Sequence, residues 1–72
     1  MSLAFYVTGL LSGKKHMIWE ADLASGKRAR TLCGVRITNW DRYLVGADTA
    51  DGAESTCRRC SRALLLRALK ER

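Results

Sequence analysis

Two cysteines separated by two residues, Cys57 and Cys60, are the residues of this sequence best suited to chemistry. Cys33 and the single histidine, His16, complete a set of four sulfur and imidazole donors. Three thiolates and one imidazole fill a tetrahedral shell around Zn²⁺, and structural zinc sites use these ligand types. The sequence therefore predicts a structural Zn²⁺ site formed by His16, Cys33, Cys57 and Cys60.

Other interpretations of the cysteines stay open. A redox dithiol also places Cys-x-x-Cys at a helix start, although that motif is typical of a βαβ context. The cysteines would otherwise be metal-free core residues with His16 at the surface, or ligands of an iron–sulfur cluster or another metal. Asp22 or Asp41 would replace His16 only in a site less typical of structural zinc. Because four good ligands leave no open coordination position, we expect no enzyme, no catalytic residue and no small-molecule substrate.

The length of 72 residues allows one domain, residues 1–72. A core of this size is expected to need a disulfide, a bound metal or a partner chain to be stable. Three cysteines cannot all pair within one chain, which argues against a disulfide-built secreted module. The apolar residues 1–11 lack the basic region of a signal peptide and fall short of the roughly 20 residues of a membrane span. We therefore expect a cytoplasmic protein with no membrane association.

Strands must bring His16 and Cys33 together. A hairpin loop at Ala24-Ser25 would place these two residues directly opposite each other, and a loop at Ser25-Gly26 would make them diagonal neighbours. Gly34, directly after Cys33, predicts a turn with positive φ that directs backbone N–H groups toward the sulfur. The expected strands are residues 3–8 (with a free edge), 14–21 (central in the sheet), 28–37 (the return strand after a turn at 24–27) and 42–45.

A helix from Cys57 to about Lys70 follows the polar loop 47–54, since its residues are good helix formers without glycine or proline. Ser55 or Thr56 is the expected N-cap. One side of this helix should cover the sheet and the metal; it carries Cys57, Cys60, Leu64 and Ala68. The predicted fold class is α+β: a small antiparallel sheet of three to four strands followed by one C-terminal helix, stapled by zinc.

The order His16, Thr31-Leu32-Cys33-Gly34, Trp40 and Thr56-Cys57-Arg58-Arg59-Cys60 resembles a group of small uncharacterised zinc-finger proteins found in actinobacteria and their phages and plasmids. These proteins are of the zinc-ribbon or treble-clef kind, with three cysteines and one histidine. The resemblance covers roughly residues 14–66. It implies metal ligation by the same four residues and a mobile-element context. The apolar N-terminal strand and the leucine-rich helix end are not part of the motif.

The net charge of +6 is concentrated in the last quarter of the chain. Residues 55–72 hold six basic residues against one acidic residue, whereas residues 1–54 hold seven against six. We therefore expect a regulatory protein that binds DNA through its basic helix. The expected nucleic-acid contacts are Arg58, Arg59, Arg62, Arg67 and Lys70.

The alternative function is a protein–protein interaction adaptor or a homodimer that acts on a host or partner protein, for example the transcription machinery. The C-terminal half of the helix is apolar almost all round, which is typical of a helix buried on more than one side. In a chain this short, a second chain is the expected cover. The expected interface residues are Leu65, Leu66 and Leu69.

Overall fold

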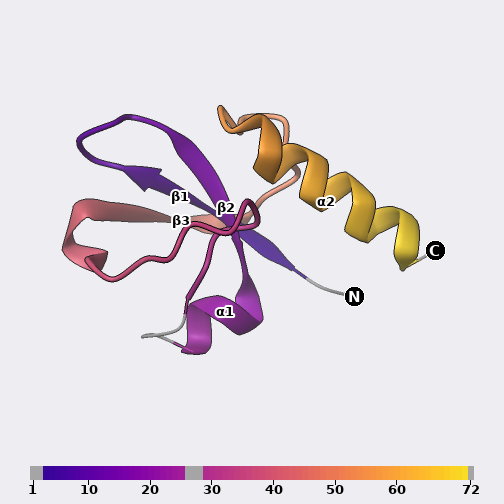
Figure 1. Cartoon of the computed structure of the whole chain (residues 1–72), viewed down its shortest axis with the longest axis horizontal. Coiled ribbons are helices and arrows are strands. Elements are labelled where there is room, and N and C mark those ends of the chain that lie inside the picture. The colour runs from indigo at the N-terminus through magenta and orange to yellow at the C-terminus, as the bar shows by residue number, and fades with distance from the viewer. Residues whose placement is uncertain (1–2, 26–28, 72) are drawn as a thin grey trace.

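The computed structural model describes residues 3–25 and 29–71. It has the predicted α+β fold, with a three-stranded antiparallel sheet and a C-terminal helix (Figure 1). The elements in chain order are β1 (Ala4–Gly9), β2 (Lys15–Trp19), α1 (Glu20–Ser25), the 3-10 helix η2 (Trp40–Arg42), β3 (Tyr43–Thr49) and α2 (Arg58–Lys70). No helix in the described ranges is both long and apolar enough to cross a membrane.

The strand order is β2-β1-β3, so β1 is the central strand. Val7 of β1 lies opposite His16 on one side and Val45 on the other. The expectation that the second strand is central and the first has a free edge was therefore wrong. The short connection after Gly9 pairs β1 directly with β2, and β3 returns to the opposite side of β1.

The strand expected at residues 14–21 ends at Trp19, because α1 begins at Glu20. Glu20 and Asp22 lie in the first turn of α1, where negative charge is favourable. Neither proposed hairpin loop is confirmed: Ala24-Ser25 belongs to α1, and residues 26–28 of the expected turn and return strand lie outside the described residues.

The return strand expected at residues 28–37 is replaced, in its described part, by a tight reversal of the chain. Arg30 and Arg36 form an antiparallel bridge with each other, so the two halves of the segment pair together. The reversal is possible because Gly34 has φ +96, a conformation that glycine adopts without the steric cost of a Cβ. This confirms the turn predicted at Cys33-Gly34.

One contact of this segment with β2 keeps the expected register. Thr31 forms an antiparallel bridge with Ile18, and the Leu32 N–H donates to the Met17 carbonyl over 2.8 Å. Continuing that register by one more pair places Cys33 across from His16. The pairing that the Ala24-Ser25 loop implied is thus present, although the loop itself is not.

The main core lies on the sheet face that carries Val7 and Ile18. Both side chains are fully buried, together with Ala29 and Ile37 from the segment that crosses this face. The half-buried side chains packed around them are Phe5, Leu23, Trp40 and Tyr43. This core fixes both β2 and the 29–37 segment, which are the two elements that carry His16 and Cys33.

The connection from β3 to α2 is held by Tyr6 of β1. Its hydroxyl donates to Asp51 over 2.9 Å and accepts the backbone N–H groups of Gly52 and Glu54, each at 3.1 Å. The loop expected at 47–54 is shorter than predicted, because β3 extends to Thr49 and Tyr6 organises the residues after it. This loop therefore positions the start of α2.

Candidate metal centre

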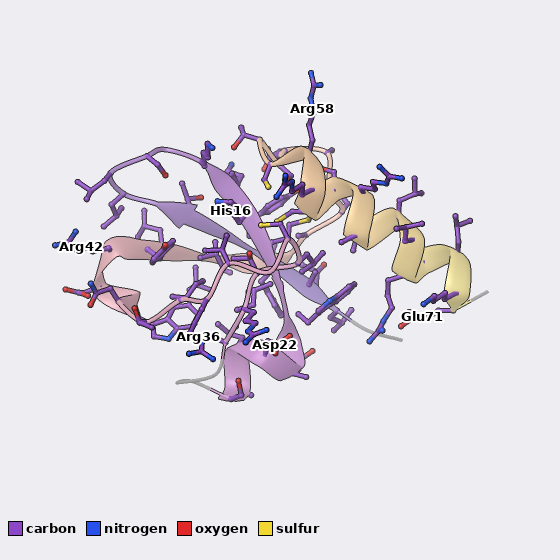
Figure 2. The ribbon with its side chains drawn as sticks, viewed as in Figure 1. His16, Asp22, Arg36, Arg42, Arg58 and Glu71 are labelled. Atoms are coloured by element: carbon purple, nitrogen blue, oxygen red, sulfur yellow. The ribbon has the colours of Figure 1, made fainter. Side chains whose placement is uncertain are left out.

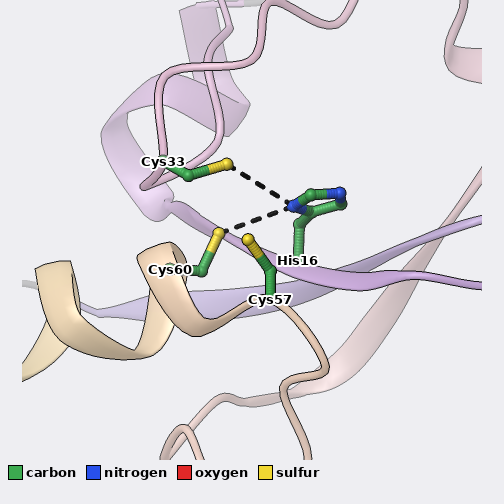
Figure 3. A group of neighbouring side chains, drawn as sticks. All are labelled: His16, Cys33, Cys57 and Cys60. Carbon is green, nitrogen blue, oxygen red and sulfur yellow. Dashed lines mark hydrogen bonds between the residues drawn. The ribbon is translucent and has the colours of Figure 1, made fainter.

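The structure brings His16, Cys33, Cys57 and Cys60 into one cluster (Figure 3). Their donor atoms all lie within 4.8 Å of one another. The Nδ1 atom of His16 is 3.5 Å from the sulfur of Cys33 and 3.6 Å from the sulfur of Cys60. Four donor atoms that converge in this way could hold a metal ion.

Cys33 sits at the tip of the 29–37 reversal, where neighbouring groups donate toward its sulfur. The Thr31 hydroxyl is 3.0 Å from the sulfur, and the same hydroxyl accepts the Val35 N–H over 3.1 Å. Burial acts to raise the pKa of Cys33, but the Thr31 hydroxyl, the Cys60 and Cys57 thiols and the Val35 N–H outweigh it and lower that pKa below its usual 9.0. Cys33 is therefore converted more readily than Cys60 to the thiolate that a metal requires.

Cys57 is positioned by hydrogen bonds to the residue before His16. The Lys15 N–H donates to the Thr56 hydroxyl over 2.6 Å, and the Thr56 N–H donates back to the Lys15 carbonyl over 3.1 Å. The Ser55 hydroxyl donates to the same carbonyl at 3.1 Å. These bonds join the chain ahead of α2 to β2, so Cys57 arrives beside His16.

Cys57 itself is the N-cap of α2, in place of the expected Ser55 or Thr56. The Ser55 hydroxyl accepts the Cys57 N–H at 3.3 Å, which is a bond outside the helix. The hydroxyls of Ser55 and Thr56 are used to join β2, which explains why neither caps the helix. The predicted helix boundaries are otherwise confirmed.

Cys60, in the first turn of α2, is fully buried. Burial raises the pKa of its thiol to about 12, and the neighbouring Cys33 adds to the rise. Cys33 ionises before Cys60, because the pKa of Cys33 is lowered and that of Cys60 is raised. A second negative charge on the neighbouring Cys60 is then unfavourable. A bound cation would remove this cost and let both sulfurs ionise.

His16 is half-buried on β2 and directs Nδ1 at the sulfurs of Cys33 and Cys60 (Figure 3). Burial and the nearby Lys14 ammonium lower the pKa of its imidazole below 6.5. The neutral imidazole, which is the form that coordinates metals, therefore predominates at neutral pH. The structure therefore does not fit the alternative in which the cysteines are core residues and His16 lies at the surface, apart from them.

The five basic residues expected to contact nucleic acid are all exposed, but they do not share one surface. Arg58 and Arg59 line the same groove as His16, Cys33 and Lys14. Arg67 instead lies over the Trp19 ring at 5.3 Å and pairs with Glu71 at 3.2 Å. The structure thus separates a basic surface at the start of α2 from a basic residue that anchors its far end.

The leucine-rich end of α2 is exposed. The exposed fractions of Leu65, Leu66 and Leu69 are 61%, 52% and 52%. The side of the helix that was expected to cover the sheet does so only through its first two turns: Cys60 is buried and Leu64 half-buried, whereas Ala68 is exposed. The expectation for Ala68 was wrong because α2 projects past the sheet at its C-terminal end (Figure 1).

Sequence reasoning assigned no role to Thr31 and considered Thr56 only as an N-cap, although the hydroxyls of both threonines support the cluster. Both threonines were present in the Thr-Leu-Cys-Gly and Thr-Cys-x-x-Cys motifs. A threonine two residues before one cysteine and another directly before a second was the available signal. The Thr31 hydroxyl reaches the Cys33 sulfur through local geometry, whereas the Thr56 hydroxyl bonds to Lys15 in a distant part of the sequence.

The fold and the cluster define the class of protein: a small α+β chain in which three cysteines and one histidine form a cluster that could bind a metal ion. No family model, curated protein or solved structure matches the chain.

Proposed function

We propose that the cluster binds one structural zinc ion, and that the zinc-stapled module binds DNA through the basic surface at the start of α2. The observation that carries the zinc assignment is the spacing of the donor atoms. Zinc bonded to sulfur at about 2.3 Å and nitrogen at about 2.0–2.1 Å, at tetrahedral angles, holds those atoms about 3.6 Å apart. The two sulfur-to-Nδ1 distances in the cluster are 3.5 and 3.6 Å.

The zinc would connect three elements of the fold through one ion. His16 comes from β2, Cys33 from the reversal after α1, and Cys57 and Cys60 from the start of α2. A single ion would fix the orientation of α2 relative to the sheet. With four protein ligands in place there is no open coordination position, so the proposed role of the metal is structural rather than catalytic.

The basic surface consists of Lys14, Arg58, Arg59 and Arg62, and all four side chains are exposed. Arg58 points away from the body of the molecule (Figure 2). Within the described part of the chain, none of the four is in an ion pair. Unpaired cations at a helix N-terminus, where the helix dipole adds positive potential, favour the binding of phosphate groups.

If the module binds DNA at this surface, its role is regulatory or accessory, since the proposed metal is structural and would not catalyse a reaction of the nucleic acid. Phosphate contacts provide affinity for any sequence, and α2 has the dimensions to enter a major groove. Arg67 is not part of the proposed contact, because its guanidinium already engages Trp19 and Glu71. Lys70 is the last residue of α2, at the end away from the metal, and is at most a peripheral contact.

The test is the salt dependence of binding to a short DNA duplex, measured by fluorescence anisotropy with the zinc-loaded protein. Each lost phosphate contact reduces the slope of log K against log salt by roughly 0.9. We expect Arg58→Ala with Arg59→Ala to reduce the slope by about 2 and to weaken binding at low salt.

The matched control is Arg36→Ala with Arg42→Ala, which changes net charge equally. Both control side chains are exposed and lie away from α2 (Figure 2). An equal loss in the two double variants would mean that binding depends on overall charge and not on this surface. Absence of binding to the duplex at low salt would overturn the nucleic-acid proposal and leave the zinc assignment intact.

A further inference from the structure

The exposed leucines of α2 form a continuous apolar surface, which we call the leucine face: Leu65, Leu66 and Leu69. Leu69 follows Leu65 by four residues and Leu66 by three, so it is a direct helical neighbour of both and joins them in one surface. More than half of each side chain is exposed, although three such leucines within five residues are costly to leave in water. No described part of the chain covers this surface, because α2 projects beyond the sheet (Figure 1).

Cations flank the leucine face at both ends. Arg62 precedes Leu65 and Leu66 by three and four residues, and Lys70 follows Leu66 by four, so these side chains are direct helical neighbours. The carboxylate of Glu71 pairs with Arg67, which lies over Trp19 on the other side of the helix. The surface therefore presents an apolar centre with a positive rim.

We propose that the leucine face is the docking site for an acidic amphipathic helix of a partner protein. Such a helix would pack its own apolar residues on Leu65, Leu66 and Leu69, which is the usual way that amphipathic helices recognise one another. Its flanking carboxylates would meet Arg62 and Lys70. Complementary charge at the rim fixes the partner and its orientation, while the apolar centre provides affinity.

A second copy of this chain fits the surface less well. Packing α2 on α2 would bury the leucines but would bring Arg62 and Lys70 of both copies to the same rim. Like charges placed together at an interface are unfavourable and select against that pairing. The charge of the leucine face, rather than its apolarity alone, thus points to a partner of opposite sign.

The test is selection from a displayed library of helical peptides in which leucines are fixed on one face and the flanking positions are randomised to Glu or Lys. The bait is the full-length, zinc-loaded protein. We expect enrichment of peptides with Glu at the flanks, and binding of a selected peptide should weaken at least about tenfold on exchange of its Glu residues for Lys.

The variant Leu66→Glu with Leu69→Glu should abolish binding of the selected peptide, and Leu66→Gln with Leu69→Gln should weaken it without adding charge. Leu11→Glu is the matched control, because Leu11 is 83% exposed on the hairpin between β1 and β2. Arg58→Ala with Arg59→Ala should leave peptide binding within about threefold, which separates this site from the proposed DNA contacts at Arg58 and Arg59; Arg62 borders both surfaces.

Two results would overturn the proposal. The first is no enrichment, or enrichment of Lys-flanked peptides. The second is a dimer of the wild-type protein in analytical ultracentrifugation that becomes monomeric in Leu66→Glu with Leu69→Glu, since a second copy would then cover the leucine face. Metal content and far-UV circular dichroism of each variant verify that it is folded.

Discussion

The hydroxyl of Thr31 lies 3.0 Å from the sulfur of Cys33. Thr31 is almost fully buried, and its hydroxyl also accepts the N–H of Val35. When Cys33 is a thiolate, this hydroxyl can only donate to the sulfur, so its proton is directed at the candidate metal ligand. The pair shows how the 29–37 reversal both aims the sulfur and stabilises its negative charge.

Thr31→Val should weaken metal binding by about 10- to 100-fold, because outer hydrogen-bond partners orient and stabilise ligands. Valine keeps the shape of threonine and replaces only the hydroxyl with a methyl group. Competition with a chelator of known affinity measures the change. Thr38→Val, at an exposed position, is the control and should bind metal as the wild type does; equal affinities of the two variants would show that the Thr31 hydroxyl has no role.

Gly34→Ala should destabilise the zinc-loaded protein by about 1–2 kcal/mol, because an L-residue is strained at positive φ. No atom beyond Gly34 and its two chain neighbours lies within 4 Å of the position that a Cβ would occupy, so the cost arises from the backbone alone. Urea denaturation provides the measurement. Gly46→Ala is the control, since its Cβ would make only an ordinary 3.6 Å contact with Tyr6; similar losses at both sites would contradict the backbone explanation.

Metal affinity should rise steeply with pH between about 7 and 9. The pKa of Cys60 is raised to about 12 by burial, so its thiol must lose a proton when the metal binds. One proton released per ion corresponds to a tenfold gain in affinity per pH unit. His16 adds little in this range because its pKa is lowered below 6.5. Cys60→Ala should have weaker affinity and a slope shallower by about one proton, and a pH-independent wild type would contradict proton release from Cys60.

The raised pKa of Cys60 also predicts that the stability of the metal-free chain depends on pH. A pKa raised from 9.0 to about 12 means that folding favours the protonated Cys60 thiol. The stability that this thiol contributes is therefore fully present below pH 9 and is lost as the pH rises toward 12. Urea denaturation of chelated protein at pH 8 and pH 10.5 should show the decline, whereas metal-loaded protein, whose thiolates are already formed, should not.

Arg67→Gln should destabilise the protein by about 0.5–1 kcal/mol through loss of the contact over Trp19. DNA affinity should change much less than it does in Arg62→Gln, which removes the same charge from the exposed basic surface. Thermal denaturation and fluorescence anisotropy measure the two effects. A larger loss of DNA affinity in the Arg67 variant would assign that arginine to the binding surface.

The four candidate ligands could be predicted from the sequence because residue type and spacing restrict them. Cys57 and Cys60 are three residues apart at the start of a strongly helical segment, so one turn of helix places both at the site. The sequence also predicted that His16 and Cys33 lie opposite each other, from the strand register that a hairpin loop at Ala24-Ser25 would give. That register survives because Thr31 pairs with Ile18 even though α1 occupies the connection.

The strand order and the environment of α2 could not be predicted in the same way. β1 is central because β3, more than 30 residues further along the chain, pairs with it, and local patterns do not report such long-range pairing. The exposure of Ala68 depends on where the sheet ends, which a helical wheel does not show. Thr31 and Thr56 act through contacts that became evident only with the backbone in place.

Native mass spectrometry of protein purified without added metal, followed by chelation monitored by circular dichroism and thiol alkylation, is the decisive test of the zinc assignment. We predict one zinc per chain, protection of all three thiols, and thiol exposure with a less stable fold when the zinc is removed. A folded chain that carries no metal and whose Cys33 and Cys57 alkylate freely would contradict the assignment.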